Sequence, residues 1–211
     1  MPGVAKKRVP HPRQSAKEAY RQTILAAAEQ EFARAGFALV KMADIARAAG
    51  VAVGTLYNYF ESKEEIFEQI LALRCAEMRA SLTEALRGGT PIGNVQAVVR
   101  QSLENLERQG ALFAVFIERG AVAEYDLERI AGQLAQQEYQ RYLTMIGDVL
   151  RTAVDAGDLR KDIPVPTMAA TLSGAINGVT YAWLKRRRRG RLTAFTDDLL
   201  KLFLAGARKS P

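Results

Sequence analysis

Almost every stretch of this chain carries apolar residues at the spacing of one face of an α-helix. No stretch alternates apolar and polar residues as a half-buried strand does. This periodicity predicts an all-α protein. Glycines and prolines interrupt the pattern, because neither residue continues a helix well. We expect about nine helices, over residues 15–35, 41–49, 52–59, 62–86, 92–108, 111–120, 126–156, 167–184 and 193–207.

Two of the expected helix starts carry a capping-box pattern. In such a box a serine accepts a hydrogen bond from a free backbone N–H, and a glutamate three residues later reaches back. One is Ser15-Ala-Lys-Glu18 and the other is Ser62-Lys-Glu-Glu65. Gly36 suits the left-handed C-cap of the first helix. Residues 1–14 are rich in proline and basic side chains, so we expect a disordered arm there.

Histidine and cysteine are too scarce for several kinds of chemistry, since His11 and Cys75 are the only ones. A zinc site lacks ligands, a histidine-based dyad lacks a partner, and glycine-rich phosphate loops are absent. We therefore predict no catalytic residue, no metal and no cofactor. One cysteine suits a reducing compartment, and residues 1–14 lack the apolar stretch of a secretory signal, so we expect a cytoplasmic protein.

The net charge of +7 is unevenly distributed along the chain. Residues 1–63 carry ten basic and five acidic side chains, residues 64–184 carry eleven and sixteen, and residues 185–211 carry nine and two. A positive N-terminal region suits a module that binds phosphates, because neutralising them releases counterions. A generally basic, solvated surface is the alternative.

The sharpest local pattern lies within residues 42–60. Ala46 is small where two helices must cross closely, Gly50 follows four residues later, and Leu56 comes six residues after that. Two short helices joined by a tight glycine turn can present the second helix to the major groove of DNA. A plain helical hairpin with the same spacing is the alternative.

The residues around this pattern resemble the DNA-binding domain of the TetR family of transcriptional regulators. The run ADIARAAGVAVGTLYNYF from Ala43 to Phe60 continues as ESKEEIF, and it matches nearly all of the family's D-I-A…A-G-V-x-x-G-T-L-Y-x-Y/H-F-x-S-K-E pattern. The resemblance implies a three-helix helix-turn-helix domain over residues 15–61. It also implies a helical ligand-binding and dimerisation bundle over residues 62–211, whose first helix is the connector.

The resemblance further implies a set of contacts with DNA. The glycine at position 54 lets the second helix approach the DNA backbone, the Tyr57 hydroxyl donates to phosphate, and Lys63 reaches phosphate from a helix N-terminus. Ordinary packing is the alternative for both Tyr57 and Tyr59. The expected DNA-binding residues are Lys41, Ala43, Val53, Gly54, Thr55, Tyr57, Asn58, Tyr59 and Lys63.

Three positions depart from the family's pattern. Lys41 stands where a capping Thr or Ser is usual, so a cap worth about 1 kcal/mol is lost, although Lys41 can still contact phosphate. Ala52 and Val53 stand where Ser followed by Lys or Arg is common. We expect Val53 to contact a thymine methyl group, and DNA shape to supply part of the specificity.

The last two expected helices suit a dimer interface. Residues 167–184 are nearly apolar all round, with Ala170, Gly174 and Gly178 spaced four apart, and residues 193–207 are amphipathic. In the family, the last two helices of each subunit pair with their mates, so we expect a homodimer on a palindromic operator in double-stranded DNA.

A membrane span is the alternative for residues 167–184, because the basic run from Lys185 to Arg191 follows an apolar helix. The polar residues and glycines within that helix favour a protein without a membrane partner. The basic run is then a solvated loop, or an extra contact with DNA or acidic lipid.

The resemblance also implies a repressor that is released by a small apolar or amphipathic effector. We expect any pocket to lie among the helices between residues 92 and 184, although each lining residue is alternatively plain core. The expected lining residues are Phe113, Phe116, Tyr142, Met145, Asn177 and Trp183. A regulator controlled by a protein partner, with no small-molecule pocket, is the second hypothesis.

Overall fold

The structure is a computed structural model that describes residues 12–118, 127–186 and 189–207. At the edges of these ranges, residues 12–16, 116–118 and 127–131 are described by their backbone alone. Most of the expected arm at residues 1–14, and the side chain of Phe116, therefore fall outside the described part of the chain.

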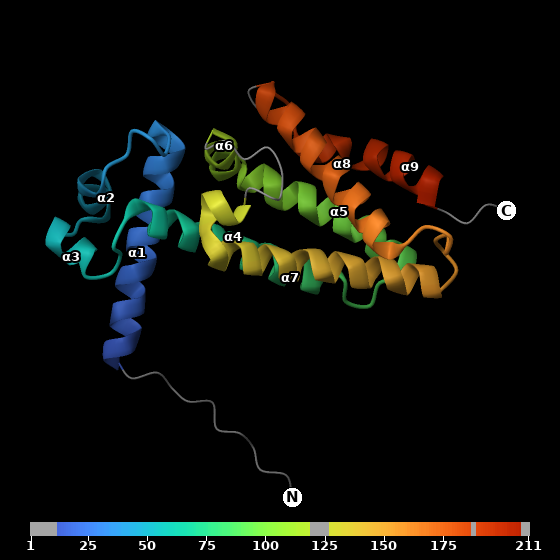
Figure 1. Ribbon diagram of the computed structural model, residues 1–211, viewed down its shortest axis with the longest axis horizontal. Coiled ribbons are helices and arrows are strands. Elements are labelled where there is room, and N and C mark those ends of the chain that lie inside the picture. The colour runs from blue at the N-terminus through green and yellow to red at the C-terminus, as the bar shows by residue number, and fades with distance from the viewer. Residues whose placement is uncertain (1–11, 119–126, 187–188, 208–211) are drawn as a thin grey trace, which may run out of the picture. The chain divides into compact units, whose positions relative to one another are not determined.

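Helices and turns make up the described residues, with no β-strand among them, and this confirms the expected all-α fold (Figure 1). In chain order the elements are α1 (Pro12–Ala35), α2 (Met42–Ala49), α3 (Val53–Tyr57), α4 (Lys63–Ala85), α5 (Pro91–Arg108), α6 (Gly110–Glu118), α7 (Leu127–Asp155), α8 (Val165–Lys185), the 3₁₀ helix η2 (Leu192–Phe195) and α9 (Thr196–Ala207). The sequence did not predict η2, which occupies the start of the expected helix over residues 193–207.

Helix α1 begins three residues before the predicted capping box. Its first residue is Pro12, which suits that position because proline has no N–H to leave unpaired and its φ is already helical. Ser15 and Glu18 lie inside the helix, so the capping box predicted there is wrong. The predicted C-cap is confirmed: Gly36 has a φ of 78°, and its N–H donates to the Phe32 carbonyl at 2.9 Å.

The chain divides into two compact units, residues 1–67 and 68–211, and the boundary falls inside α4. In the first unit, the rings of Phe32, Phe37 and Phe67 pack together with centroids 5.1 to 5.8 Å apart. This aromatic cluster joins the end of α1 to the first turns of α4. The other fully buried large side chains of this unit are Ile24, Ile45, Leu56, Phe60 and Ile66.

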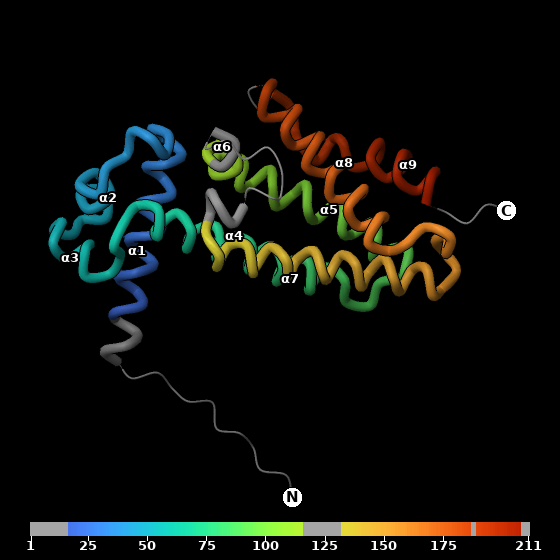
Figure 2. The backbone as a smooth tube through the Cα atoms, in the orientation of Figure 1, coloured from blue at the N-terminus to red at the C-terminus, as the bar shows by residue number. Residues whose placement is uncertain are grey.

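Helix α5 is the central helix of the second unit, where it packs against α7, α8, η2 and α9 (Figure 2). Thr90 caps its N-terminus by accepting the Gly93 N–H at 3.1 Å, and Pro91 follows as the first helical residue. The buried face of α5 follows helical spacing. It consists of Val95, Val98, Val99, Ser102, Leu103, Asn105 and Leu106.

Helix α8 buries one face and exposes the other. Met168, Leu172, Ile176 and Trp183 belong to the core, whereas the small residues Ala170, Gly174 and Gly178 are exposed. A Cβ atom added at either of these glycines would meet nothing within 4 Å. None of the helices in the described ranges combines the length and the apolarity needed to cross a membrane.

Helix α7 is interrupted at Gly132, which the sequence did not predict. Its φ of 84° and ψ of 171° define a backbone conformation that is open almost only to glycine. A Cβ atom there would lie 2.2 Å from the carboxyl carbon of Glu68, and Glu68 accepts the Leu134 N–H at 2.8 Å. The Glu68 carboxylate of α4 therefore caps the part of α7 that follows the break.

Replacement of this glycine tests the interruption. Gly132→Ala should lower the free energy of unfolding by about 1–3 kcal/mol, because alanine is strained in this conformation and its Cβ would collide with Glu68. Urea unfolding followed by circular dichroism measures the change. Gly147→Ala is the matched control, since Gly147 lies within α7 with open space around it, and it should stabilise the protein by up to about 1 kcal/mol.

Candidate functional site

Helices α2 and α3 form a compact hairpin around a glycine turn. Gly50 has a φ of 68°, and the next N–H, that of Val51, donates to the Ala46 carbonyl at 3.0 Å. Ala46 is 1% exposed and Leu56 is fully buried. Because the five-residue α3 is too short to be stable alone, the burial of Leu56 fixes its position on the rest of the unit.

The N-terminus of α2 carries a cap that the sequence did not reveal. The Lys41 side chain does not cap it, as expected, because an ammonium group has no lone pair to accept a hydrogen bond. Instead, the Asp44 carboxylate accepts the backbone N–H of Lys41 at 3.1 Å. This is the second half of a capping box. Asp44, three positions after the N-cap, was the available signal in the sequence. A capping box is usually recognised by a serine or threonine at the N-cap, and that position is Lys41 here.

Most of the expected DNA-binding residues are exposed. These are Lys41, Ala43, Val53, Gly54, Tyr57 and Asn58, whereas Thr55 is half-buried. The exposed fraction is 42% for Val53 and 54% for Tyr57, which is large for an aliphatic and an aromatic side chain. Packing within the described part of the chain therefore covers less than half of Tyr57.

Gly54 lies inside α3, where a glycine costs about 1 kcal/mol relative to alanine. A Cβ atom built on Gly54 would meet nothing within 4 Å, so no described part of the chain requires a glycine there. Close approach by a partner outside the chain is a physical reason for the absence of a side chain at this position.

Tyr59 is half-buried against α1. Its ring stacks on that of Tyr20 with centroids 6.5 Å apart, and the Lys17 ammonium lies 6.0 Å from the Tyr59 centroid. This contact favours the packing interpretation of Tyr59. A contact of Tyr59 with Lys17 and Tyr20 was not predicted from the sequence, although the spacing of three places Lys17 and Tyr20 on one helix face.

Lys63, the first residue of α4, holds the loop between α1 and α2. Its ammonium donates to the carbonyls of Phe37 and Val40, both at 2.9 Å, and lies 3.4 Å from that of Ala38. It also lies 4.6 Å from the centroid of the Phe37 ring. An ammonium group has three hydrogens, so three carbonyls can use them all.

This geometry differs from the phosphate contact expected of Lys63. In the structure the ammonium holds the loop that leads into Lys41, and a phosphate would have to compete with those carbonyls. We therefore propose that Lys63 positions the start of α2. The serine half of the capping box predicted for α4 is confirmed, because Ser62 Oγ accepts the Glu65 N–H at 3.1 Å. The Glu65 carboxylate reaches back one residue further than predicted and accepts the N–H of Glu61 at 2.7 Å.

The expected ligand-pocket residues fall in or beside the core of the second unit. Tyr142 and Trp183 are buried members of that core, Phe113 and Met145 pack against it, and Asn177 is half-buried. The Trp183 indole N–H donates to the Gly190 carbonyl at 2.9 Å. This hydrogen bond joins the end of α8 to Gly190, within the basic run from Lys185 to Arg191.

The polar end of Tyr142 is also occupied within the chain. Ser102 donates to the Val98 carbonyl at 2.6 Å, so the Tyr142 hydroxyl donates to Ser102. Burial raises the pKa of Tyr142 to about 12. Tyr142 is therefore neutral at physiological pH.

Four buried polar side-chain atoms have no hydrogen-bond partner in the described part of the chain, and all belong to the second unit. They are Arg79 Nε, Asn105 Nδ2, Gln136 Oε1 and Ser173 Oγ. An unsatisfied buried donor or acceptor costs about 1–3 kcal/mol. Water or a bound molecule that supplies the missing hydrogen bonds would relieve this cost.

Comparison with known proteins gives one family. A sequence profile of the family described as "Bacterial regulatory proteins, tetR family" matches residues 24–70. Over 171 residues the chain is 30% identical to the HTH-type transcriptional regulator SrpR of Pseudomonas putida, and the match covers 81% of this chain and 78% of SrpR.

Solved structures have the same fold. The fatty acid degradation regulator FadR of Bacillus halodurans superposes with a TM-score of 0.78 at 19% identity, over 94% of this chain and 98% of that one. FadR of Bacillus subtilis, solved in complex with stearoyl-CoA, superposes with a TM-score of 0.72 at 22% identity, over 88% and 98% of the two chains.

A substitution tests the proposed role of Lys63. Lys63→Met keeps the length of the side chain but removes its donors, so it should lower the free energy of unfolding by about 1–3 kcal/mol. Urea unfolding measures the loss. Lys41→Met removes an exposed charge at the end of the same loop, and it should change stability by less than about 0.5 kcal/mol. Equal small effects in the two variants would contradict the positioning role.

Proposed function

The chain belongs to the tetR family of bacterial regulatory proteins, and we propose that it is a transcriptional repressor. In this proposal it binds a palindromic operator as a homodimer through α2 and α3, and a small molecule bound in the second unit releases it. Membership of the family carries the general statement, a DNA-binding regulator that responds to a ligand. The geometry of individual residues supports the more specific proposal of a homodimeric repressor that a small molecule releases from a palindromic operator.

The single observation that most supports DNA binding through α3 is the open space around Gly54. Val53 and Tyr57, which flank it in the same short helix, are largely exposed, and the buried Leu56 holds α3 in place. A bare backbone beside an exposed tyrosine hydroxyl can approach a phosphate closely. In the proposal, Gly54 admits the DNA backbone and Tyr57 donates to phosphate.

Val53 and Ala52 give α3 an apolar, exposed beginning. A valine side chain cannot hydrogen-bond to a base edge, but it can contact the methyl group of thymine. We propose that Val53 makes this contact and that DNA shape supplies part of the specificity. Uracil in place of the contacted thymine removes the methyl group, so it should weaken binding by the wild-type protein.

The homodimer is proposed to form through α8 and α9. One chain leaves Ala170, Gly174 and Gly178 of α8 exposed, and Leu202 of α9 is 77% exposed. Small residues along one face let a second helix come close, and an exposed leucine supplies apolar surface to bury. Two α3 helices related by a two-fold axis can read the two halves of a palindrome.

Two observations support a small-molecule effector. The buried polar atoms without partners lie in the second unit, and a relative with the same fold was solved with stearoyl-CoA. A molecule that combines an apolar chain with polar groups would suit a core that contains such atoms. Control by a protein partner is the competing outcome, and a second unit that binds no small molecule would favour it.

Selection of bound duplexes from a random pool, followed by titration of the selected duplex, tests DNA binding. Gly54→Ala should weaken binding at least about tenfold, because the added methyl group separates backbone and phosphate, yet it should stabilise the fold by up to about 1 kcal/mol. Gly147→Ala, an equivalent change in α7, should leave DNA affinity unaltered. Unchanged affinity in Gly54→Ala would remove the main support for the proposed contact.

A bulky charge on α8 tests the dimer. Gly178→Arg should convert the protein to a monomer in analytical ultracentrifugation and weaken operator binding, because the side chain would occupy the space of the second subunit. A Cβ atom at position 178 meets no other atom of the same chain within 4 Å, so the substitution should not disturb the fold of the monomer and the helical content should persist. Thr144→Arg, at an exposed position on α7, is the control and should remain dimeric. A dimeric Gly178→Arg protein would place the interface elsewhere.

A further inference from the structure

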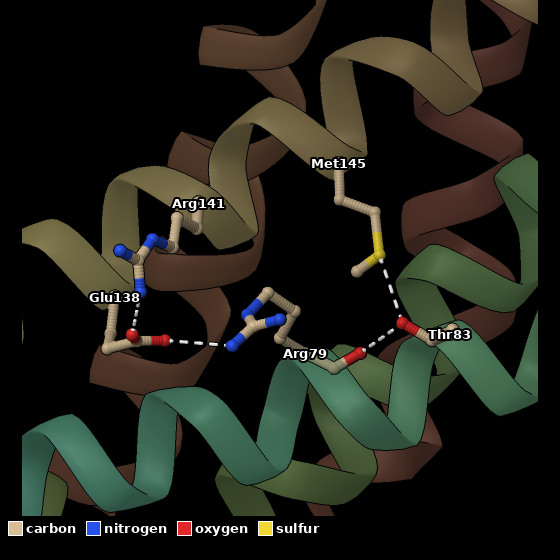
Figure 3. Close-up of polar contacts among 5 residues, drawn as sticks. All are labelled: Arg79, Thr83, Glu138, Arg141 and Met145. Atoms are coloured by element: carbon tan, nitrogen blue, oxygen red, sulfur yellow. Dashed lines mark hydrogen bonds and ion pairs between the residues drawn. The ribbon is translucent and has the colours of Figure 1, made fainter. Parts of the chain in front are cut away.

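Arg79 of α4 and Glu138 of α7 form an ion pair between the two helices (Figure 3). The distance between Arg79 Nη2 and Glu138 Oε2 is 3.1 Å. The other carboxylate oxygen of Glu138 accepts from Arg141, one turn further along α7. One carboxylate thus serves two guanidinium groups, and the three side chains together carry one excess positive charge.

The guanidinium group of Arg79 is only half used by this pair. Its Nε is buried and has no hydrogen-bond partner among the residues that the structure describes, whereas Nη2 bonds to Glu138. The Nε and Nη2 donors of arginine form a fork that matches the two oxygens of a carboxylate or phosphate. Glu138 takes one branch of that fork and leaves the other empty, at the cost of an unsatisfied buried donor.

Arg141 gives Glu138 a second cation. The Glu138 side chain is only 12% exposed, so a complete loss of its cations would leave a poorly solvated negative charge. Because Arg141 lies on the same helix as Glu138, that pair does not depend on α4. Glu138 can therefore release Arg79 without becoming an isolated charge.

This polar cluster is partly open to solvent, since the side chains of Arg79 and Arg141 are 39% and 61% exposed. Met145 lies beside it, with its sulfur 3.6 Å from the hydroxyl of Thr83, which donates to the Arg79 carbonyl at 2.8 Å (Figure 3). Cys75, one turn before Arg79, has its pKa raised to about 12, first by burial and then by the Glu138 charge. Tyr142 follows Glu138 by one turn and is buried. A ligand that reaches Arg79 would therefore find side chains of low polarity close to the positive fork.

We propose that Arg79 binds the anionic group of an amphipathic ligand, a carboxylate or phosphate attached to an apolar chain. The anion takes the Nε–Nη2 fork and displaces Glu138, which keeps its bond to Arg141. This inference rests on the proposed ligand-controlled function and names the class of ligand. The exchange replaces the Arg79–Glu138 contact on α4, the helix that also carries Lys63.

Calorimetric titration with matched probes tests the exchange. Dodecanoate, dodecyl phosphate and dodecanol share one chain and differ in the head group, and all are used below the concentrations at which they form micelles. At least one of the two anions should bind the wild-type protein at least tenfold more tightly than the alcohol. The preference between the two anions distinguishes a carboxylate ligand from a phosphate ligand.

Two variants should shift anion affinity in opposite directions. Arg79→Met should weaken binding of the preferred anion at least tenfold, and Glu138→Gln should strengthen it, because the competing carboxylate is gone. Arg79→Lys keeps the charge without the fork and should fall between wild type and Arg79→Met. Dodecanol affinity should be the same in all of them. Arg87→Met, which removes an exposed arginine just after α4, is the control and should behave as wild type.

Several results would overturn the inference. These are equal affinity for anion and alcohol, no binding of any probe to wild type, full anion affinity in Arg79→Met, or weaker binding of every probe in both Arg79→Met and Glu138→Gln. The last pattern would mean that the pair only stabilises the fold. Binding of the selected duplex by the same ligand-free samples is a separate readout, so failure of the anion site and failure of the DNA-binding proposal are distinguishable.

Discussion

The burial of Leu56 is the contact on which the proposed DNA-binding surface depends. A helix of five residues is not stable alone, so α3 exists because Leu56 enters the core beside Ile45 and Phe60, all at most 1% exposed. Gly50 permits the tight turn that brings Leu56 there. With Leu56 as the buried anchor, Val53, Gly54 and Tyr57 stay exposed and can face a partner.

Polar contacts then fix the surroundings of that surface. Asp44 caps the start of α2, and Lys63 binds the carbonyls of the loop that precedes it. Both contacts act on backbone groups that the turn between α1 and α2 would otherwise leave without hydrogen bonds. Among the described residues, the buried polar side-chain atoms without a hydrogen-bond partner all belong to the second unit. This difference between the two units supports a sensing role for the second unit.

Periodicity and glycine positions predicted the helices well, because apolar spacing and left-handed caps are local properties. Gly36 and Gly50 both have the positive φ that the sequence indicated. The start of α1 was wrong because two cap signals competed, and Pro12 prevailed over Ser15. The break at Gly132 depends on Glu68, which is distant in sequence, so no local pattern reveals it.

The exposed residues of α3 could largely be predicted from the sequence, whereas the partners of Lys63 and Tyr59 could not, since both contacts involve residues more than twenty positions away.

The central claim is that the face of α3 meets DNA. Hydrogen–deuterium exchange on the protein with and without its selected duplex tests it most directly. Protection should concentrate in residues 41–59. Protection confined to the basic C-terminal residues 185–207, with no change across α2 and α3, would contradict it.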